Sequence, residues 1–243
     1  MSNLSSFQNS PGKSLLTLPI FTLPDNSVNR WTSNSIERLK DDLKDLESVP
    51  LIIEDVFLAD EQRRYSAEQI NDRLYPLIEY FLIKFRALHD HLSDIVLGCS
   101  RLKHQHRQPL EGSFPTLYAA LKNRQNERNR TVNPRSYMDP EAVKLITRIQ
   151  EKYLNGFNRM RNHIIHDAAN VTVTKINQYQ ILFYLENSVT EDEYQTFPHY
   201  VDKTEKNRIN FRSMYESEMR HLVTTLNTLY DVVKKHAKLN GAG

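Results

Sequence analysis

One short stretch of the sequence concentrates side chains that could perform chemistry: residues 158–167 read NRMRNHIIHD. It holds two arginines, two histidines, two asparagines and an aspartate around only three apolar residues. Histidine exchanges a proton near neutral pH, and arginine binds phosphate oxygens through paired hydrogen bonds. These residue types suit acid–base chemistry on a phosphate, metal binding, or simply the solvated side of a helix.

Helical geometry separates these side chains into two faces, because successive residues are about 100° apart. The apolar sector consists of Phe157, Met160, Ile164 and Ala168, and the polar strip consists of Arg159, Asn162, His163 and His166. Arg161 breaks the division, because it lies about 40° from Phe157 within the apolar sector. An unpaired buried charge is costly, so this guanidinium must find a carboxylate, reach an interface or bind a ligand.

Three interpretations of the stretch are open. In the first, Arg161 pairs with an acid of the bundle and the histidines are structural. In the second, His163, His166 and Asp167 bind a metal, since their spacing makes them neighbours on a helix. The HExxH arrangement is missing, however, and cations flank the two histidines of residues 101–108, so we expect no metal. In the third, histidine and arginine cleave RNA without a metal, because the ribose 2′-hydroxyl supplies the nucleophile.

The segment RNHIIH, from Arg161 to His166, resembles the signature of HEPN domains: an arginine, a polar Asn, Asp or His, three variable residues and a histidine. Its position late in a helix that follows a long bundle helix is also similar, and the resemblance covers roughly residues 66–238. HEPN domains are small α-helical bundles that often dimerise around two such motifs. Many are metal-independent endoribonucleases of toxin–antitoxin, phage-defence and CRISPR systems, and others bind nucleotides or act as scaffolds.

This resemblance implies specific roles and partners. Arg161 would stabilise the phosphate, His166 would transfer a proton, and Asn162 would orient both. The pattern does not require His163 and Asp167, which would tune His166 or be incidental; together with Arg159 they are the expected supporting residues. The products would be a 2′,3′-cyclic phosphate and a 5′-hydroxyl, formed without a cofactor. The expected partners are RNA and a second copy of the chain, and an antitoxin or regulatory protein could be a further one.

A single copy of the motif faces a geometric difficulty. Arg161 and His166 are five residues apart, which places them about 140° apart around an ideal helix and about 7.5 Å apart along it. They can act together through a curled arginine side chain, a distorted helix or a second subunit. The HEPN resemblance favours the second subunit.

The distribution of charge favours RNA as a partner. The formal net charge is only +2, but residues 101–135 hold eight basic side chains and two acidic ones. Such a segment attracts phosphates. We expect the RNA backbone to contact Arg124, Arg128, Arg130 and Arg135.

Apolar periodicity and helix-capping signals predict a mainly α fold of long helices with a small β-hairpin insertion. The resemblance implies that these helices form a HEPN-like antiparallel bundle. A flexible arm, residues 1–32, precedes a single helical domain, residues 33–240. A basic connector spans residues 98–139, and the hairpin spans residues 171–186 with its turn at Asn177 and Gln178. The expected helices span about 33–47, ended by Pro50, then 66–96, 115–124, 140–168 and 203–239.

The sequence also suggests a cellular location. A single cysteine, Cys99, excludes an internal disulfide and fits a reducing compartment. The first residues lack the basic start and apolar block of a signal peptide. The most apolar run, residues 74–84, is interrupted by Glu79 and Lys84. We therefore expect a cytoplasmic protein that does not enter a membrane.

Overall fold

Long α-helices dominate the computed structural model, which describes residues 30–61, 66–100, 113–122, 138–166, 171–177, 180–185, 190–202 and 208–240. The longest helices are α3 (Arg30–Glu61), α4 (Ala67–Ser100) and α9 (Phe211–Asn240). A further rod consists of α6 (Pro140–Ile149), the π-helical turn η4 (Gln150–Leu154) and α7 (Asn155–His166). The shorter elements are α5 (Phe114–Lys122), β1 (Val171–Asn177), β2 (Gln180–Leu185), α8 (Glu191–Thr196) and β3 (Arg208–Asn210). The predicted mainly α fold class is confirmed.

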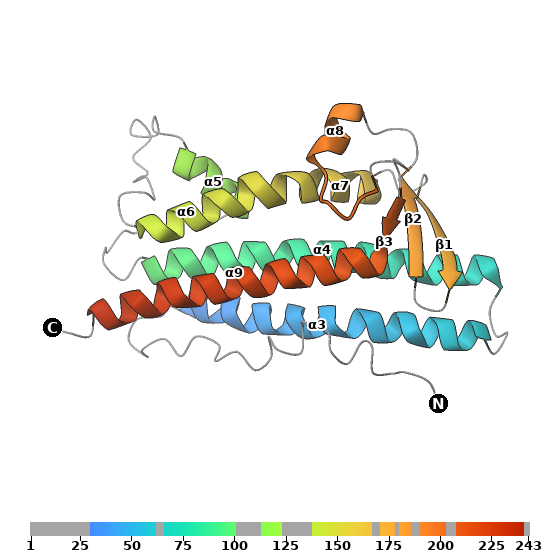
Figure 1. The fold of residues 1–243 in the computed structure, drawn as a ribbon. Helices are drawn as coiled ribbons and strands as arrows, with labels where there is room; N and C mark the ends of the chain where they lie inside the picture. Colours follow the sequence, from blue (N-terminus) through green and yellow to red (C-terminus); the bar gives the residue numbers. More distant parts are fainter. Residues whose placement is uncertain are drawn as a thin grey trace.

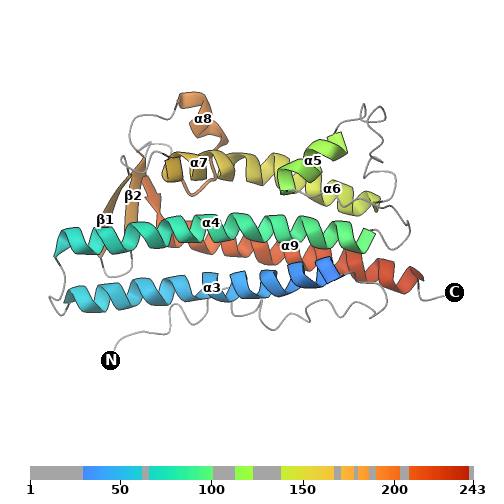
Figure 2. The ribbon, with the colours of Figure 1, turned by 180° about the vertical axis from the view of Figure 1, so that it is seen from behind.

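The helices are stacked in layers around α4 and α9. Seen from both sides, α3 runs along one side of this pair and the α6–η4–α7 rod runs along the other (Figures 1 and 2). The short α8 lies over α7, and the small sheet lies at the end of the bundle where α7 ends (Figure 1). The rod that carries the RNHIIH motif therefore forms an outer layer of the molecule.

The sequence signals for α4 are confirmed in detail. The Ser66 hydroxyl accepts a hydrogen bond from the Gln69 N–H at 3.2 Å, and the Gln69 side-chain oxygen accepts one from the Ser66 N–H at 2.9 Å, which is a capping box. Apolar residues recur along α4 at helical spacing, and Leu77 among them is only partly buried. The fully buried ones are Ile70, Leu74, Ile78, Phe81, Leu82, Phe85, Leu88, Leu92, Ile95 and Val96.

The prediction that Pro50 ends the first helix is wrong, because α3 continues through it to Glu61. A proline inside a helix lacks the N–H that would bond to the carbonyl four residues earlier. The cost is offset because the apolar stripe continues on both sides of Pro50, with Leu46, Val49 and Ile53 buried in the core. Tertiary packing here outweighs the local helix-breaking signal.

The predicted hairpin is present, but its surroundings differ from the prediction. Asn177, predicted to be in the turn, is instead a strand residue paired with Gln180. Strand β3 adds a third antiparallel strand beside β2. The last helix therefore begins at Phe211 rather than near residue 203, and the Asn210 side chain caps it by accepting the Ser213 N–H at 3.1 Å.

Several predictions fall outside the described residues. These are the arm up to residue 29, most of the basic connector, and the proposed RNA contacts Arg124, Arg128, Arg130 and Arg135. Residues 30–32, assigned to the arm, belong to α3 instead. Asp167 and the surroundings of the Cys99 side chain also lie outside what is described.

Candidate active site

Helix α7 is held in place by its apolar stripe and by one hydrogen bond near its end. Phe157, Met160 and Ile164 are fully buried, as the helical pattern predicts. The Tyr75 hydroxyl of α4 donates to the Ile164 carbonyl oxygen at 3.0 Å. The last carbonyls of a helix lack partners within it, so this bond satisfies one of them and joins the motif to the bundle.

Arg161 is half-buried, as expected from its place in the apolar sector. Its Nη1 donates to the Asn162 side-chain oxygen at 3.0 Å. Its buried Nε has no hydrogen-bond partner among the described residues. Burial lowers the pKa of Arg161, the positive charge of Arg86 lowers it further, and Asp90 opposes both. The guanidinium is thus partly desolvated and close to a second cation.

The nearby carboxylate of Asp90 is already engaged by other groups. It accepts a hydrogen bond from Arg86 Nη1 at 2.7 Å, and the backbone N–H of Phe114 donates to it at 2.7 Å. Within the described residues, no carboxylate forms an ion pair with Arg161. The first of the three outcomes predicted for Arg161, pairing with an acid of the bundle, is therefore not found in that part of the chain.

Two of the predicted supporting residues contact α8 or the residue that follows it. Arg159 Nη1 donates to the Thr196 hydroxyl at 3.3 Å. The His163 ring lies 6.0 Å, centroid to centroid, from the Phe197 ring. At Gly156 the backbones approach so closely that a Cβ would overlap the Thr196 carbonyl oxygen. This side of α7 is a packing surface for α8.

Asn162 and His166 belong to the same polar strip of α7 and are exposed. Asn162 contacts Arg161, but no hydrogen bond among the described residues joins His166 to either of them. The structure thus brings Arg161 and Asn162 together and leaves His166 about one and a half turns away along the helix.

A second group of polar side chains, not singled out from the sequence, lies inside the bundle at the level of η4. The rings of Tyr153 and His221 stack with centroids 3.4 Å apart, and the His89 ring lies 5.8 Å from that of His221. Burial lowers the pKa of His89 to about 3 and that of His221 to about 4. These histidines are neutral at pH 7 and pack as aromatic rings.

Glu218 is fully buried one turn before His221. Burial raises its pKa well above the usual value, and neither carboxyl oxygen has a hydrogen-bond partner among the described residues. Both of these buried polar residues could have been recognised from the sequence, because each falls on the apolar stripe of its helix. Glu218 lies four residues after Met214, and His89 lies four residues after Phe85. No group of His, Cys, Asp or Glu within the described residues could hold a metal ion.

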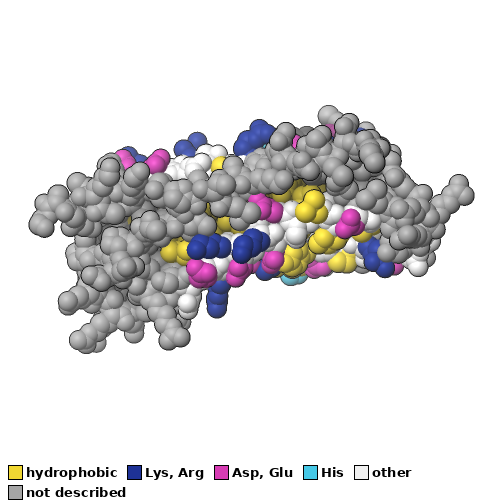
Figure 3. Space-filling model, turned by 90° about the horizontal axis from the view of Figure 1, so that it is seen from below, with side chains coloured by type: hydrophobic (Ala, Val, Ile, Leu, Met, Phe, Trp, Pro, Cys, Tyr) yellow, Lys and Arg dark blue, Asp and Glu magenta, His cyan; other side chains and the backbone are white. Residues whose placement is uncertain are grey.

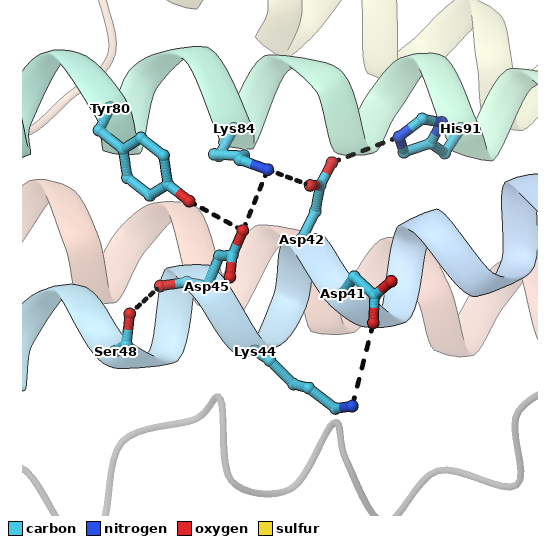
Figure 4. A network of polar contacts seen from close by, with 8 residues as sticks. All are labelled: Asp41, Asp42, Lys44, Asp45, Ser48, Tyr80, Lys84 and His91. Atoms are coloured by element: carbon cyan, nitrogen blue, oxygen red, sulfur yellow. Dashed lines mark hydrogen bonds and ion pairs between the residues drawn. The ribbon is translucent and has the colours of Figure 1, made fainter.

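A polar network joins α3 to α4 on the opposite side of the bundle (Figure 4). Lys84 Nζ lies 2.6 Å from an Asp42 oxygen and 3.0 Å from an Asp45 oxygen, and these two hydrogen bonds raise its pKa. The Tyr80 hydroxyl donates to Asp45 at 2.8 Å, and His91 lies 3.3 Å from Asp42. Because these contacts join side chains of α3 to side chains of α4, the network connects the two helices.

The outer face of α3 and α4 mixes apolar and charged side chains (Figure 3). Among the described residues, the exposed large apolar side chains are those of Leu51, Ile52, Tyr80 and Ile83. Single exposed apolar residues are common on protein surfaces. This face is therefore a weaker candidate for an active site than α7.

A pocket of about 590 Å³ lies on the exposed face of the rod, before the motif. Its described lining residues are Met138, Pro140, Val143, Lys144, Thr147, Arg148, Glu151 and Lys152. Three of these eight are cations at positions i, i+4 and i+8. The pocket and Arg161 thus lie on the same helical rod.

Comparison of the chain with protein-family models, with curated proteins and with solved structures finds no match. The HEPN resemblance therefore rests on the motif and its helical context. Among the described helices, none combines the length and the apolarity that crossing a bilayer requires.

Proposed function

We propose that the chain is a metal-independent endoribonuclease of the HEPN type, acting as a homodimer in a toxin–antitoxin or phage-defence system. The observation that carries the proposal is the state of Arg161. Arg161 is half-buried, and its Nε lacks a described partner. The charges that act on it are those of the cation Arg86 and of Asp90, which is already engaged by other groups. A partly desolvated cation attracts an anion more strongly than a solvated one, and a scissile phosphate would be that anion.

The proposed reaction is transfer of the phosphodiester to the neighbouring ribose oxygen. His166 accepts the proton of the 2′-hydroxyl, and the 2′-oxygen attacks phosphorus while the bond from phosphorus to the 5′-oxygen breaks. The departing 5′-oxygen takes a proton from water. Arg161 stabilises the additional negative charge on the phosphate oxygens, and Asn162 orients the guanidinium through its 3.0 Å hydrogen bond.

A dimer would bring the two groups together, because no hydrogen bond among the described residues joins them within one chain. His166 is exposed and Arg161 is half-buried, and the two positions lie about 140° apart around an ideal helix. In the proposed dimer, Arg161 of one protomer and His166 of its partner act on the same phosphate across a two-fold axis.

The same separation favours a second candidate function, a non-catalytic module that binds nucleotides or organises an assembly. In that case Arg161 would bind an anion without cleavage, and His166 would be an ordinary surface residue. The two candidates differ in one measurable property, the turnover of RNA.

The test is cleavage of a fluorescently labelled single-stranded RNA in excess EDTA. We expect cleavage that leaves 2′,3′-cyclic phosphate ends, and a rate loss of about 100-fold or more for Arg161→Ala and for His166→Ala. Saturable nucleotide binding without cleavage would instead establish the non-catalytic function.

Matched controls are available on the same helix. Arg159→Ala and His163→Ala make the same chemical changes on the α8 side of α7, and we expect rate losses below about tenfold. Circular dichroism melting shows whether each variant is folded. Equal rates for all four variants and the parent protein would eliminate the proposed roles of Arg161 and His166.

A further inference from the structure

The pocket on the rod carries three cations in a row. Lys144, Arg148 and Lys152 are exposed and follow one another at a spacing of four residues. Residues four apart lie on the same side of a helix, about 6 Å apart along its axis. This spacing is comparable to the separation of consecutive phosphates along an extended nucleic-acid strand.

These cations are not neutralised by the acid that shares the pocket. Glu151 forms an ion pair of 2.7 Å with Lys122 of α5, and the Tyr118 hydroxyl donates to the same carboxylate oxygen at 2.6 Å. Within the described residues, Lys144, Arg148 and Lys152 form no ion pair. The pocket therefore presents a net positive charge along its length.

The rest of the lining suits the sugar and base of a nucleotide. Met138 is buried and Val143 is half-buried against the core, which gives the pocket an apolar wall beside the cations. The start of α6 is already occupied, because Asp139 accepts the Glu141 N–H at 2.6 Å. The side chains of the pocket, rather than the helix terminus, would hold the ligand.

We propose that this pocket binds the backbone of single-stranded RNA, with Lys144, Arg148 and Lys152 contacting successive phosphates. Lys152 and Arg161 are nine residues apart on the same rod, about 13 Å along the axis of an ideal helix and about half a turn around it, so the pocket is a binding site separate from Arg161. The choice of RNA as the ligand rests on the proposed ribonuclease function, whereas binding at the pocket does not require cleavage.

The test measures RNA binding separately from cleavage. A labelled single-stranded RNA of about 12 nucleotides is titrated by fluorescence anisotropy in EDTA, with His166→Ala as the background so that the RNA stays intact. Addition of Lys144→Ala, Arg148→Ala and Lys152→Ala should weaken binding at least tenfold. It should also reduce the slope of log K against log salt by about 2, since each lost phosphate contact contributes about 0.7.

A charge-matched control removes three cations from elsewhere on the surface, with Lys40→Ala, Lys44→Ala and Arg220→Ala in the same background. This variant should bind RNA within about twofold of the background. Equal affinities for the pocket variant and this control variant would overturn the pocket proposal.

The failures of the two proposals are distinguishable. If the parent protein cleaves RNA but the pocket variant binds it as well as the control variant does, the pocket proposal is wrong and the nuclease stands. If the pocket variant loses binding and the parent protein never cleaves, the pocket stands as a binding site and the nuclease proposal is wrong.

Discussion

The Tyr75 hydroxyl donates a hydrogen bond to the Ile164 carbonyl oxygen at 3.0 Å, and this bond joins α4 to α7 between Arg161 and His166. The two proposed catalytic residues stand three positions before and two positions after the anchored carbonyl. The bond is partly buried, and burial is also the main cause that raises the pKa of Tyr75. The end of the motif is therefore tied to the central layer of the bundle.

Tyr75→Phe should lower the free energy of unfolding by about 1 kcal/mol, because it leaves the Ile164 carbonyl without this partner. It should also slow RNA cleavage, since the helix end that carries His166 loses its tie to α4. Tyr80→Phe removes a hydroxyl from the same helix on the α3 side and serves as the control. A loss of activity that is equal in both variants would contradict a specific role for the Tyr75 bond.

Gly156→Ala should destabilise the protein by about 1–3 kcal/mol, even though alanine favours helix by about 1 kcal/mol over glycine. The added Cβ would overlap the Thr196 carbonyl oxygen and push α8 away from α7. Urea denaturation measures the change. Lys152→Ala, at an exposed position one turn earlier, should leave stability within about 0.5 kcal/mol of the parent, and similar stabilities for the two variants would contradict the close contact.

His89 should make the protein sensitive to acid. Its pKa in the folded protein is lowered to about 3, chiefly by burial and further by His221, from an ordinary value of 6.5. The unfolded chain therefore takes up a proton as the pH falls below 6.5, while the folded chain does not until about pH 3. The free energy of unfolding should fall across this window.

His89→Phe keeps an aromatic ring at this position and should flatten that dependence. Urea denaturation between pH 7 and pH 4.5 should show a smaller loss of stability than in the parent protein, with a residual slope from His221. His166→Ala, which removes an exposed histidine, serves as the control. Parallel pH profiles for the His89 variant and the parent would show that His89 is not the group responsible.

Mixing two inactive variants tests the proposed dimer. If each site combines Arg161 of one protomer with His166 of its partner, a mixed dimer of Arg161→Ala and His166→Ala chains holds one intact site. After the two variants are unfolded together and refolded, half of the dimers are mixed. The mixture should regain about a quarter of the parent activity, and no recovery in dimers of confirmed mixed composition would place both groups within one chain.

The local signals of the sequence determined much of the helical framework. The capping box of Ser66 and Gln69 is present, Asp139 caps α6 before Pro140, and the apolar stripe of α4 is buried as predicted. These features depend on residues within about one helical turn of one another. They can therefore be recognised in the sequence without knowledge of the tertiary structure.

The local signals failed where distant segments decide the outcome. Pro50 lies inside a helix because α3 packs its apolar stripe into the core on both sides of that residue. Ile209 is fully buried in β3 because it pairs with Phe183 of β2, a segment 26 residues away. Neither the helix through a proline nor the third strand has a signature in its own few residues.

The same division applies to the candidate site. The sequence determined by helical periodicity alone that Arg161 falls within the apolar sector of its helix, and that it must therefore meet a partner, an interface or a ligand. Only the tertiary structure decided which charged groups act on it, because Arg86 and Asp90 belong to α4, some seventy residues earlier in the chain. A helical period is set by the backbone of one segment, whereas the electrostatic surroundings of a charge are set by contacts between segments that the sequence keeps apart.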